Sequence, residues 1–205
     1  MFPEKSYDDA HHFATDYLSE LARAARAIDT EAFDAAANLV VETIRTDHTI
    51  YVCGNGGSAA ISNHLLCDFT KGIQTDTMHR PKIVSLSSHV ELITAIGNDL
   101  SFADVFVYQL RTAARPGDLL LTISSSGNSE NIVRPLQWSS NNAVRSIAMT
   151  GFDGGRARAL ADVNLHVPAH NYGIIEDLHQ SVMHILAQFV RMRSMEPGTT
   201  PTHRF

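Results

Sequence analysis

His64 and Asp68 are the first residues of the chain whose types and spacing could carry chemistry. They lie four residues apart in an expected helix, so both side chains project from one helix face. The turn before this helix, residues 54–58, is rich in glycine. Glycine lets backbone N–H groups approach an anion, and a helix start adds unpaired donors and the positive end of the helix dipole. The segment therefore predicts a phosphate site beside a polar pair, which indicates chemistry on a phosphorylated small molecule.

A second candidate anion site lies at residues 124–131, with the sequence SSSGNSEN, directly after an apolar run. Its hydroxyl groups and the backbone N–H groups of a helix start form a neutral cup rich in hydrogen-bond donors. An ordinary turn in which Ser129 only caps the helix explains this segment equally well on its own. Two such loops, each between a strand and a helix, favour phosphate binding.

The elements that would position these loops follow a regular alternation. Strands are expected at 49–52, 82–86, 118–123, 145–149 and 163–167, and helices at 59–69, 89–97, 102–114, 130–141, 157–161 and 174–195. Short apolar strands that alternate with helices predict an α/β fold with a doubly wound, mostly parallel five-stranded sheet. In such a sheet ligands bind outside the carboxyl ends of the strands, where both loops would lie.

Two further helices are expected before the first strand. Apolar residues recur with helical spacing over residues 8–46, with a break where Asp29 or Thr30 can cap the second helix. We expect one domain, made of N-terminal helices over 1–47, the α/β unit over 48–195 and a mobile tail over 196–205. These helices and the last helix carry more apolar surface than such a domain covers, which predicts self-association. His179, on the last helix, is expected at the helix surface or at an interface.

The composition is that of a soluble globular protein, with 44% hydrophobic and 19% charged residues among 205. A net charge of −6 argues against a nucleic-acid-binding surface spread over the whole protein. No apolar run has the length of a membrane span, and the first residues lack the apolar stretch of a secretory signal. Cys53 and Cys67 are expected to be reduced core thiols, and a cytoplasmic location is the resulting prediction.

Three segments together resemble the sugar isomerase (SIS) domain family. They are residues 54–60 (GNGGSAA), the pair Asn98 and Asp99, and the serine-rich loop at 124–129. Within this family the chain is similar to the phosphoheptose isomerase branch, whose relatives include the DnaA initiator-associating protein. The similarity covers nearly the whole chain. It implies a phosphosugar site formed by Asn55, Gly56, Gly57, Ser58, Asp99, Ser124, Ser126, Ser129 and Glu176.

The resemblance also implies a set of four residues near the sugar carbonyl: His64, Asp68, Glu176 and His184. Some family members bind zinc with the matching set, in which Glu stands at the position of Asp68 and Gln at that of Glu176. All four side chains here are good zinc ligands, and the added charge of Glu176 should strengthen cation binding. Asp68 is one methylene shorter than Glu, which costs reach in proton transfer. These substitutions favour a metal site over the usual base.

Each residue of this set also has a purely structural explanation. His64 and Asp68 could lie on a helix surface, satisfied by a carbonyl and a lysine. Glu176 could only favour the positive end of the last helix, and His184, with apolar neighbours in the sequence, could be a buried structural histidine. Glu176 is also about 80° from His184 around an ideal helix. Asp177 is more nearly in line with His184.

The chemistry implied by the resemblance is the interconversion of sedoheptulose 7-phosphate and D-glycero-D-manno-heptose 7-phosphate through an enediol. This reaction needs a base beside the carbonyl and an acid or a metal ion to stabilise the enediolate. We expect Asp68 and His184 to be the acid–base pair, or ligands of an assisting zinc ion. The alternative is a non-catalytic SIS module that binds a phosphosugar or a protein partner. The family implies a homotetramer.

Overall fold

The computed structural model describes residues 2–196 and 198. Its centre is a five-stranded sheet in the order β2-β1-β3-β4-β5, and all four strand pairings are parallel. The five strands are β1 (Thr49–Gly54), β2 (Lys82–Ser85), β3 (Leu119–Ser124), β4 (Arg145–Thr150) and β5 (Val163–His166). This confirms the expected α/β fold. The strand order reverses between β1 and β3, which makes the carboxyl ends of these two strands the expected ligand-binding edge.

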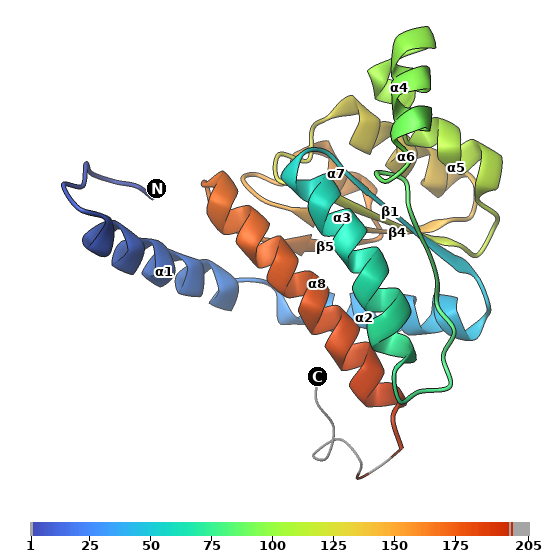
Figure 1. Cartoon of the computed structure of the whole chain (residues 1–205), viewed down its shortest axis with the longest axis horizontal. Coiled ribbons are helices and arrows are strands. Elements are labelled where there is room, and N and C mark those ends of the chain that lie inside the picture. The colour runs from blue at the N-terminus through green and yellow to red at the C-terminus, as the bar shows by residue number, and fades with distance from the viewer. Residues whose placement is uncertain (1, 197, 199–205) are drawn as a thin grey trace.

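Helices cover both faces of the sheet (Figure 1). One face packs against α2 (Thr30–Arg45), α3 (Gly57–Cys67) and α8 (Tyr172–Ser194). The other packs against α4 (Val90–Asp99), α5 (Val107–Ala113), α6 (Glu130–Asn141) and α7 (Gly155–Leu160). Alternate residues of β3 supply the two cores, since Leu119 and Leu121 belong to the first and Leu120 to the second. Strands buried on both faces explain the continuous apolar runs of the sequence.

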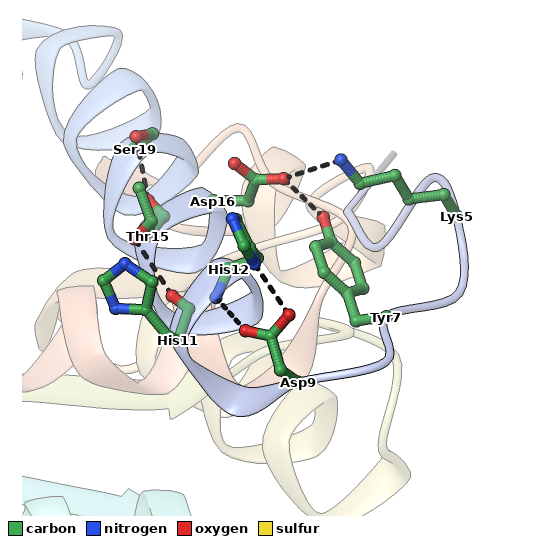
Figure 2. Close-up of polar contacts among 8 residues, drawn as sticks. All are labelled: Lys5, Tyr7, Asp9, His11, His12, Thr15, Asp16 and Ser19. Atoms are coloured by element: carbon green, nitrogen blue, oxygen red, sulfur yellow. Dashed lines mark hydrogen bonds and ion pairs between the residues drawn. The ribbon is translucent and has the colours of Figure 1, made fainter.

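The N-terminal helix α1 (Ala10–Arg26) extends to one side of the sheet (Figure 1). Figure 2 shows how it begins: Asp9 caps the helix by accepting a hydrogen bond from the His12 N–H at 2.9 Å. About two turns after Asp9, Asp16 accepts from the Tyr7 hydroxyl at 2.7 Å and pairs with Lys5 at 3.3 Å. These contacts hold the N-terminal segment against α1.

The structure differs from the sequence-based expectations in several details. The helix expected at 102–114 is divided, because Ser101 caps a short 3₁₀ turn, Phe102–Asp104, before α5 begins. In place of the helix expected at 59–69, α3 spans Gly57–Cys67 and is followed directly by a π-helical turn, Asp68–Gly72. Cys53 is buried as expected, but Cys67 is exposed.

Two further expectations concern the last helix and the tail. His179 is fully buried rather than at the surface, because it lies on the side of α8 that packs on the sheet together with Ile175 and Met183. The expected tail at 196–205 lies outside the described residues except for positions 196 and 198. In the described part of the chain, no helix combines the length and apolar character that crossing a bilayer requires.

Candidate active site

Two loops leave the carboxyl edge of the sheet next to each other. β1 and β3 pair with Gly54 opposite Ile123, so the loops that follow these strands start at the same level. The first loop enters α3 through Gly56, whose φ of 53° lies in the left-handed region that glycine adopts without strain. The second enters α6 through Ser129. No side-chain oxygen caps either helix. The carbonyl of each cap residue accepts from the third N–H, Ala59 to Gly56 at 3.0 Å and Ile132 to Ser129 at 2.9 Å, which leaves the first two N–H groups of each helix for an anion.

A polar pocket of about 160 Å³, which we call the serine pocket, lies at these loops. Reciprocal amide hydrogen bonds between Asn55 and Asn131, at 2.9 and 2.8 Å, tie the two loops to each other. Ser124 Oγ accepts from the Gly127 N–H at 3.1 Å, which orders the second loop. Hydroxyl groups dominate the lining and can donate to a phosphate ester, and Glu176 adds one carboxylate. The lining residues are Asn55, Ser58, Ile123, Ser124, Ser125, Ser126, Ser129, Tyr172 and Glu176.

A cluster of polar side chains joins α3 to α8, which lie side by side (Figure 1). Asp68 contacts two imidazole rings: its Oδ2 is 2.8 Å from His184 Nδ1, and its Oδ1 is 3.4 Å from His64 Nε2. The two rings meet edge to face, with centroids 5.0 Å apart. The side chains are 27% exposed for Asp68, 38% for His184 and 46% for His64, which leaves the cluster accessible to a ligand. The structure thus brings together three of the four residues expected near the sugar carbonyl.

Gln180 completes this cluster and is not among the residues expected from the sequence. Its Nε2 lies 2.9 Å from His64 Nδ1 and 2.9 Å from His184 Nε2. An amide nitrogen carries two hydrogens, so one side chain can donate to both rings. Gln180 stands four residues before His184, and this helical spacing is the signal that could have identified it. We call these four residues, His64, Asp68, Gln180 and His184, the histidine–aspartate cluster.

Glu176 lies apart from the histidine–aspartate cluster, whereas the sequence analysis places it in the same metal site. Eight residues separate Glu176 from His184, which is about 12 Å along the axis of an ideal helix. Glu176 lines the serine pocket instead, with its carboxylate packed so closely on Gly57 that an added Cβ there would collide with it. Among the described residues, the donor atoms close enough to share a metal ion belong to His64, Asp68 and His184, and they lie within 4.8 Å of one another.

Two other acidic residues of the sequence analysis also lie elsewhere. Asp99 stands at the exposed end of α4, where it accepts a hydrogen bond from Asn98 at 2.7 Å, and it is not among the residues that line the serine pocket. Asp177 accepts from the Tyr17 hydroxyl of α1 at 2.5 Å. Burial and this hydrogen bond raise the pKa of Tyr17 to about 12. Asp177 therefore connects α8 to α1.

Comparison with known proteins gives a consistent family. Residues 14–151 match the model of the SIS domain. The phosphoheptose isomerase of Aliarcobacter butzleri is 35% identical over 177 residues, which cover 85% of this chain and 93% of the relative. That of Roseiflexus sp. is 34% identical, covering 83% of this chain and 87% of the relative.

Solved structures agree with this result. The structure of phosphoheptose isomerase GmhA from Neisseria gonorrhoeae has a TM-score of 0.82 and 32% identity, covering 90% of this chain and all of the neighbour. A phosphoheptose isomerase from Francisella tularensis has a TM-score of 0.81 and 27% identity, covering 89% of this chain and 96% of the neighbour. With the fold, the loops and the sequence similarity in agreement, the chain belongs to the SIS domain family and to its phosphoheptose isomerase branch.

Proposed function

We propose that this protein is an aldose–ketose isomerase that interconverts sedoheptulose 7-phosphate and D-glycero-D-manno-heptose 7-phosphate. The observation that carries the proposal is the contact between Asp68 and His184 at 2.8 Å, on the same helix pair that borders the serine pocket. An acidic and a basic group 2.8 Å apart, near a pocket suited to phosphate, match the needs of enediol chemistry. The phosphoheptose isomerases among its relatives support the substrate assignment.

The serine pocket would hold the phosphate. Ser58, Ser124, Ser126 and Ser129 supply hydroxyl donors, and the first N–H groups of α3 and α6 supply backbone donors. Ser129 makes no capping hydrogen bond, so its hydroxyl is not committed to the helix. This favours phosphate binding over the ordinary capped turn that the sequence alone left open.

The spacing along α8 favours a long phosphosugar. Glu176 lines the serine pocket and His184 lies about two helical turns away, roughly 12 Å along the axis. A sugar whose reacting carbonyl lies at the end opposite its phosphate can reach both places when its carbon chain is extended. A seven-carbon ketose with a terminal phosphate has this arrangement.

Within the histidine–aspartate cluster, we assign the proton transfers to Asp68 and His184. Asp68 removes the proton from C1 of the ketose and returns it to C2, which converts the ketose into the aldose. His184 passes a proton between the O1 and O2 oxygens, so that neither the enediol nor the product keeps a charge. The partly exposed Asp68–His184 pair faces solvent, from which the sugar can enter.

The donor set also fits zinc, because two imidazoles and a carboxylate are ligands that zinc accepts and their donor atoms lie close together. His64, Asp68 and His184 would hold the ion. When bound, zinc would supply Lewis-acid stabilisation of the negative charge on the enediolate oxygen.

We also propose that the protein is a homotetramer. Apolar side chains stand exposed on α1 and α4, including Leu18 at 61% and Val90 at 63%. Surfaces of this kind, on helices that extend from the sheet, suit contact with further copies of the chain. Light scattering coupled to size-exclusion chromatography would measure the mass of the assembly, and a monomer at micromolar concentration would refute this part.

The activity is tested by incubating the protein with sedoheptulose 7-phosphate and following the aldose by NMR, in parallel samples with zinc and with a chelator. Formation of the heptose 7-phosphate in either sample supports the proposal, and the difference between samples measures the contribution of zinc. Binding of the phosphosugar without turnover in both samples would refute the enzyme and favour the non-catalytic module.

A further inference from the structure

We infer that Gln180 sets the tautomers of His64 and His184 together, and that its amide group reverses when a divalent cation enters the histidine–aspartate cluster. The inference rests on the proposed active site, because it concerns the same residues. It assigns to Gln180 a positioning role, through the two rings.

Each imidazole of the cluster lies between Asp68 on one side and Gln180 on the other. A ring lone pair close to a carboxylate oxygen is repelled by it, so the nitrogen nearest Asp68 carries the hydrogen: Nε2 of His64, at 3.4 Å, and Nδ1 of His184, at 2.8 Å. The other nitrogen of each neutral ring is then an acceptor. Both acceptors lie 2.9 Å from Gln180 Nε2, whose two hydrogens serve one ring each. One amide thereby holds two rings in opposite tautomers.

The same amide can support the reverse arrangement. Its oxygen has two lone pairs, just as its nitrogen has two hydrogens, and a half-turn of the group exchanges them. With the oxygen toward the rings, His64 presents Nδ1–H and His184 presents Nε2–H to Gln180. The lone pairs of both rings then point toward Asp68, which is repulsive unless a cation lies between them.

A divalent cation would therefore select the second arrangement. A ligating imidazole must offer a lone pair to the ion, and its remaining N–H then needs an acceptor. Gln180 can supply that acceptor to both rings without any change in the number of protons they carry. The cluster would thus alternate between a cation-free state and a cation-bound state, and in each state Gln180 hydrogen-bonds to both rings.

Substitutions at Gln180 separate this inference from simple packing. Gln180→Glu offers only acceptors, so it supports the cation-bound arrangement alone and adds a negative charge. It should bind zinc at least tenfold more tightly than the unaltered protein, in the range seen for residues that orient metal ligands. Gln180→Met has a similar length and neither strong donors nor strong acceptors, so both rings should lose their fixed tautomers.

The experiment uses the full chain labelled with nitrogen-15, first treated with chelator and then titrated with zinc. Long-range proton–nitrogen spectra of the imidazoles report which nitrogen carries the hydrogen, and the side-chain NH₂ signals of Gln180 report its amide. We expect His64 as Nε2–H and His184 as Nδ1–H without zinc, both exchanged for the other tautomer with zinc, and a shift of the Gln180 NH₂ signals. Isothermal titration with zinc alone compares the variants.

Three results would overturn the inference: tautomers in the zinc-free protein other than those stated, zinc binding that leaves the Gln180 amide signals unmoved, or rings in Gln180→Met as ordered as in the unaltered protein. None of these measurements uses sugar turnover. A failure here is therefore distinct from a failure of the proposed isomerase activity.

Discussion

Lowering the pH from 7.5 to 5 should destabilise the folded protein, with His179 as the largest single contributor. Its side chain is fully buried on α8, and neither ring nitrogen has a hydrogen-bond partner of good geometry among the described residues. Burial lowers the pKa of His179 from 6.5 to about 4, although the nearby Thr150 backbone opposes this shift. Between pH 6.5 and 4 the imidazole of His179 is protonated in the unfolded chain and neutral in the folded protein. Stability is therefore complete above pH 6.5 and is lost as the pH falls toward 4.

The size of the effect follows from the two pKa values. The pKa of His179 is 6.5 in the unfolded chain and about 4 in the folded protein. Proton linkage therefore lowers the free energy of unfolding by about 2 kcal/mol between pH 7.5 and 5, and by about 3 kcal/mol at pH 4. Urea denaturation at a fixed protein concentration measures the free energy of unfolding at each pH. His79 and His166, whose pKa values are also lowered by burial, add a loss of the same sign.

A variant without the imidazole isolates the contribution of His179. Between pH 7.5 and 5, the free energy of unfolding of His179→Leu should fall by about 2 kcal/mol less than that of the unaltered protein. All other titratable groups are common to the two proteins. Met183→Ala, at another buried position of the same helix, is the control. It should lower the free energy of unfolding by about 2 to 5 kcal/mol, and this loss should be the same at every pH. Parallel pH curves for His179→Leu and the unaltered protein would refute the reasoning.

Three further predictions concern the proposed site. Asp68→Asn keeps the shape of the side chain but removes the carboxylate, so turnover of sedoheptulose 7-phosphate should fall by about 10² to 10⁴ while calorimetry still detects phosphosugar binding; unchanged turnover would exclude Asp68 as the base. Ser129→Ala should raise the KM at least tenfold and leave the free energy of unfolding within about 0.5 kcal/mol, because this hydroxyl makes no capping bond; a loss of stability without a change in KM would instead show a structural cap. Gly57→Ala should destabilise the protein by about 1 to 3 kcal/mol through its collision with the Glu176 carboxylate, and adding Glu176→Ala should restore most of that loss in a denaturation experiment; equal stability of the single and double variants would contradict the collision.

The sequence by itself determined the sheet and the place of the serine pocket. Strand and helix periods are local properties of the chain, and the rule that ligands bind at the carboxyl edge of a parallel sheet placed the loops after Gly54 and Ile123 together. The pairing of His64 with Asp68 was also local, because a spacing of four residues puts two side chains on one helix face whatever surrounds the helix.

Only the tertiary structure decided which residues of α8 complete the site. Spacing within α8 shows which side chains share a face, but the position of α8 along α3 depends on how the two helices pack on the sheet. That packing sets His184 and Gln180 against Asp68, leaves Glu176 two turns away at the serine pocket, and buries His179 against the strands. Neither helix carries this information alone, because a contact between two helices is a property of both surfaces and of the core between them.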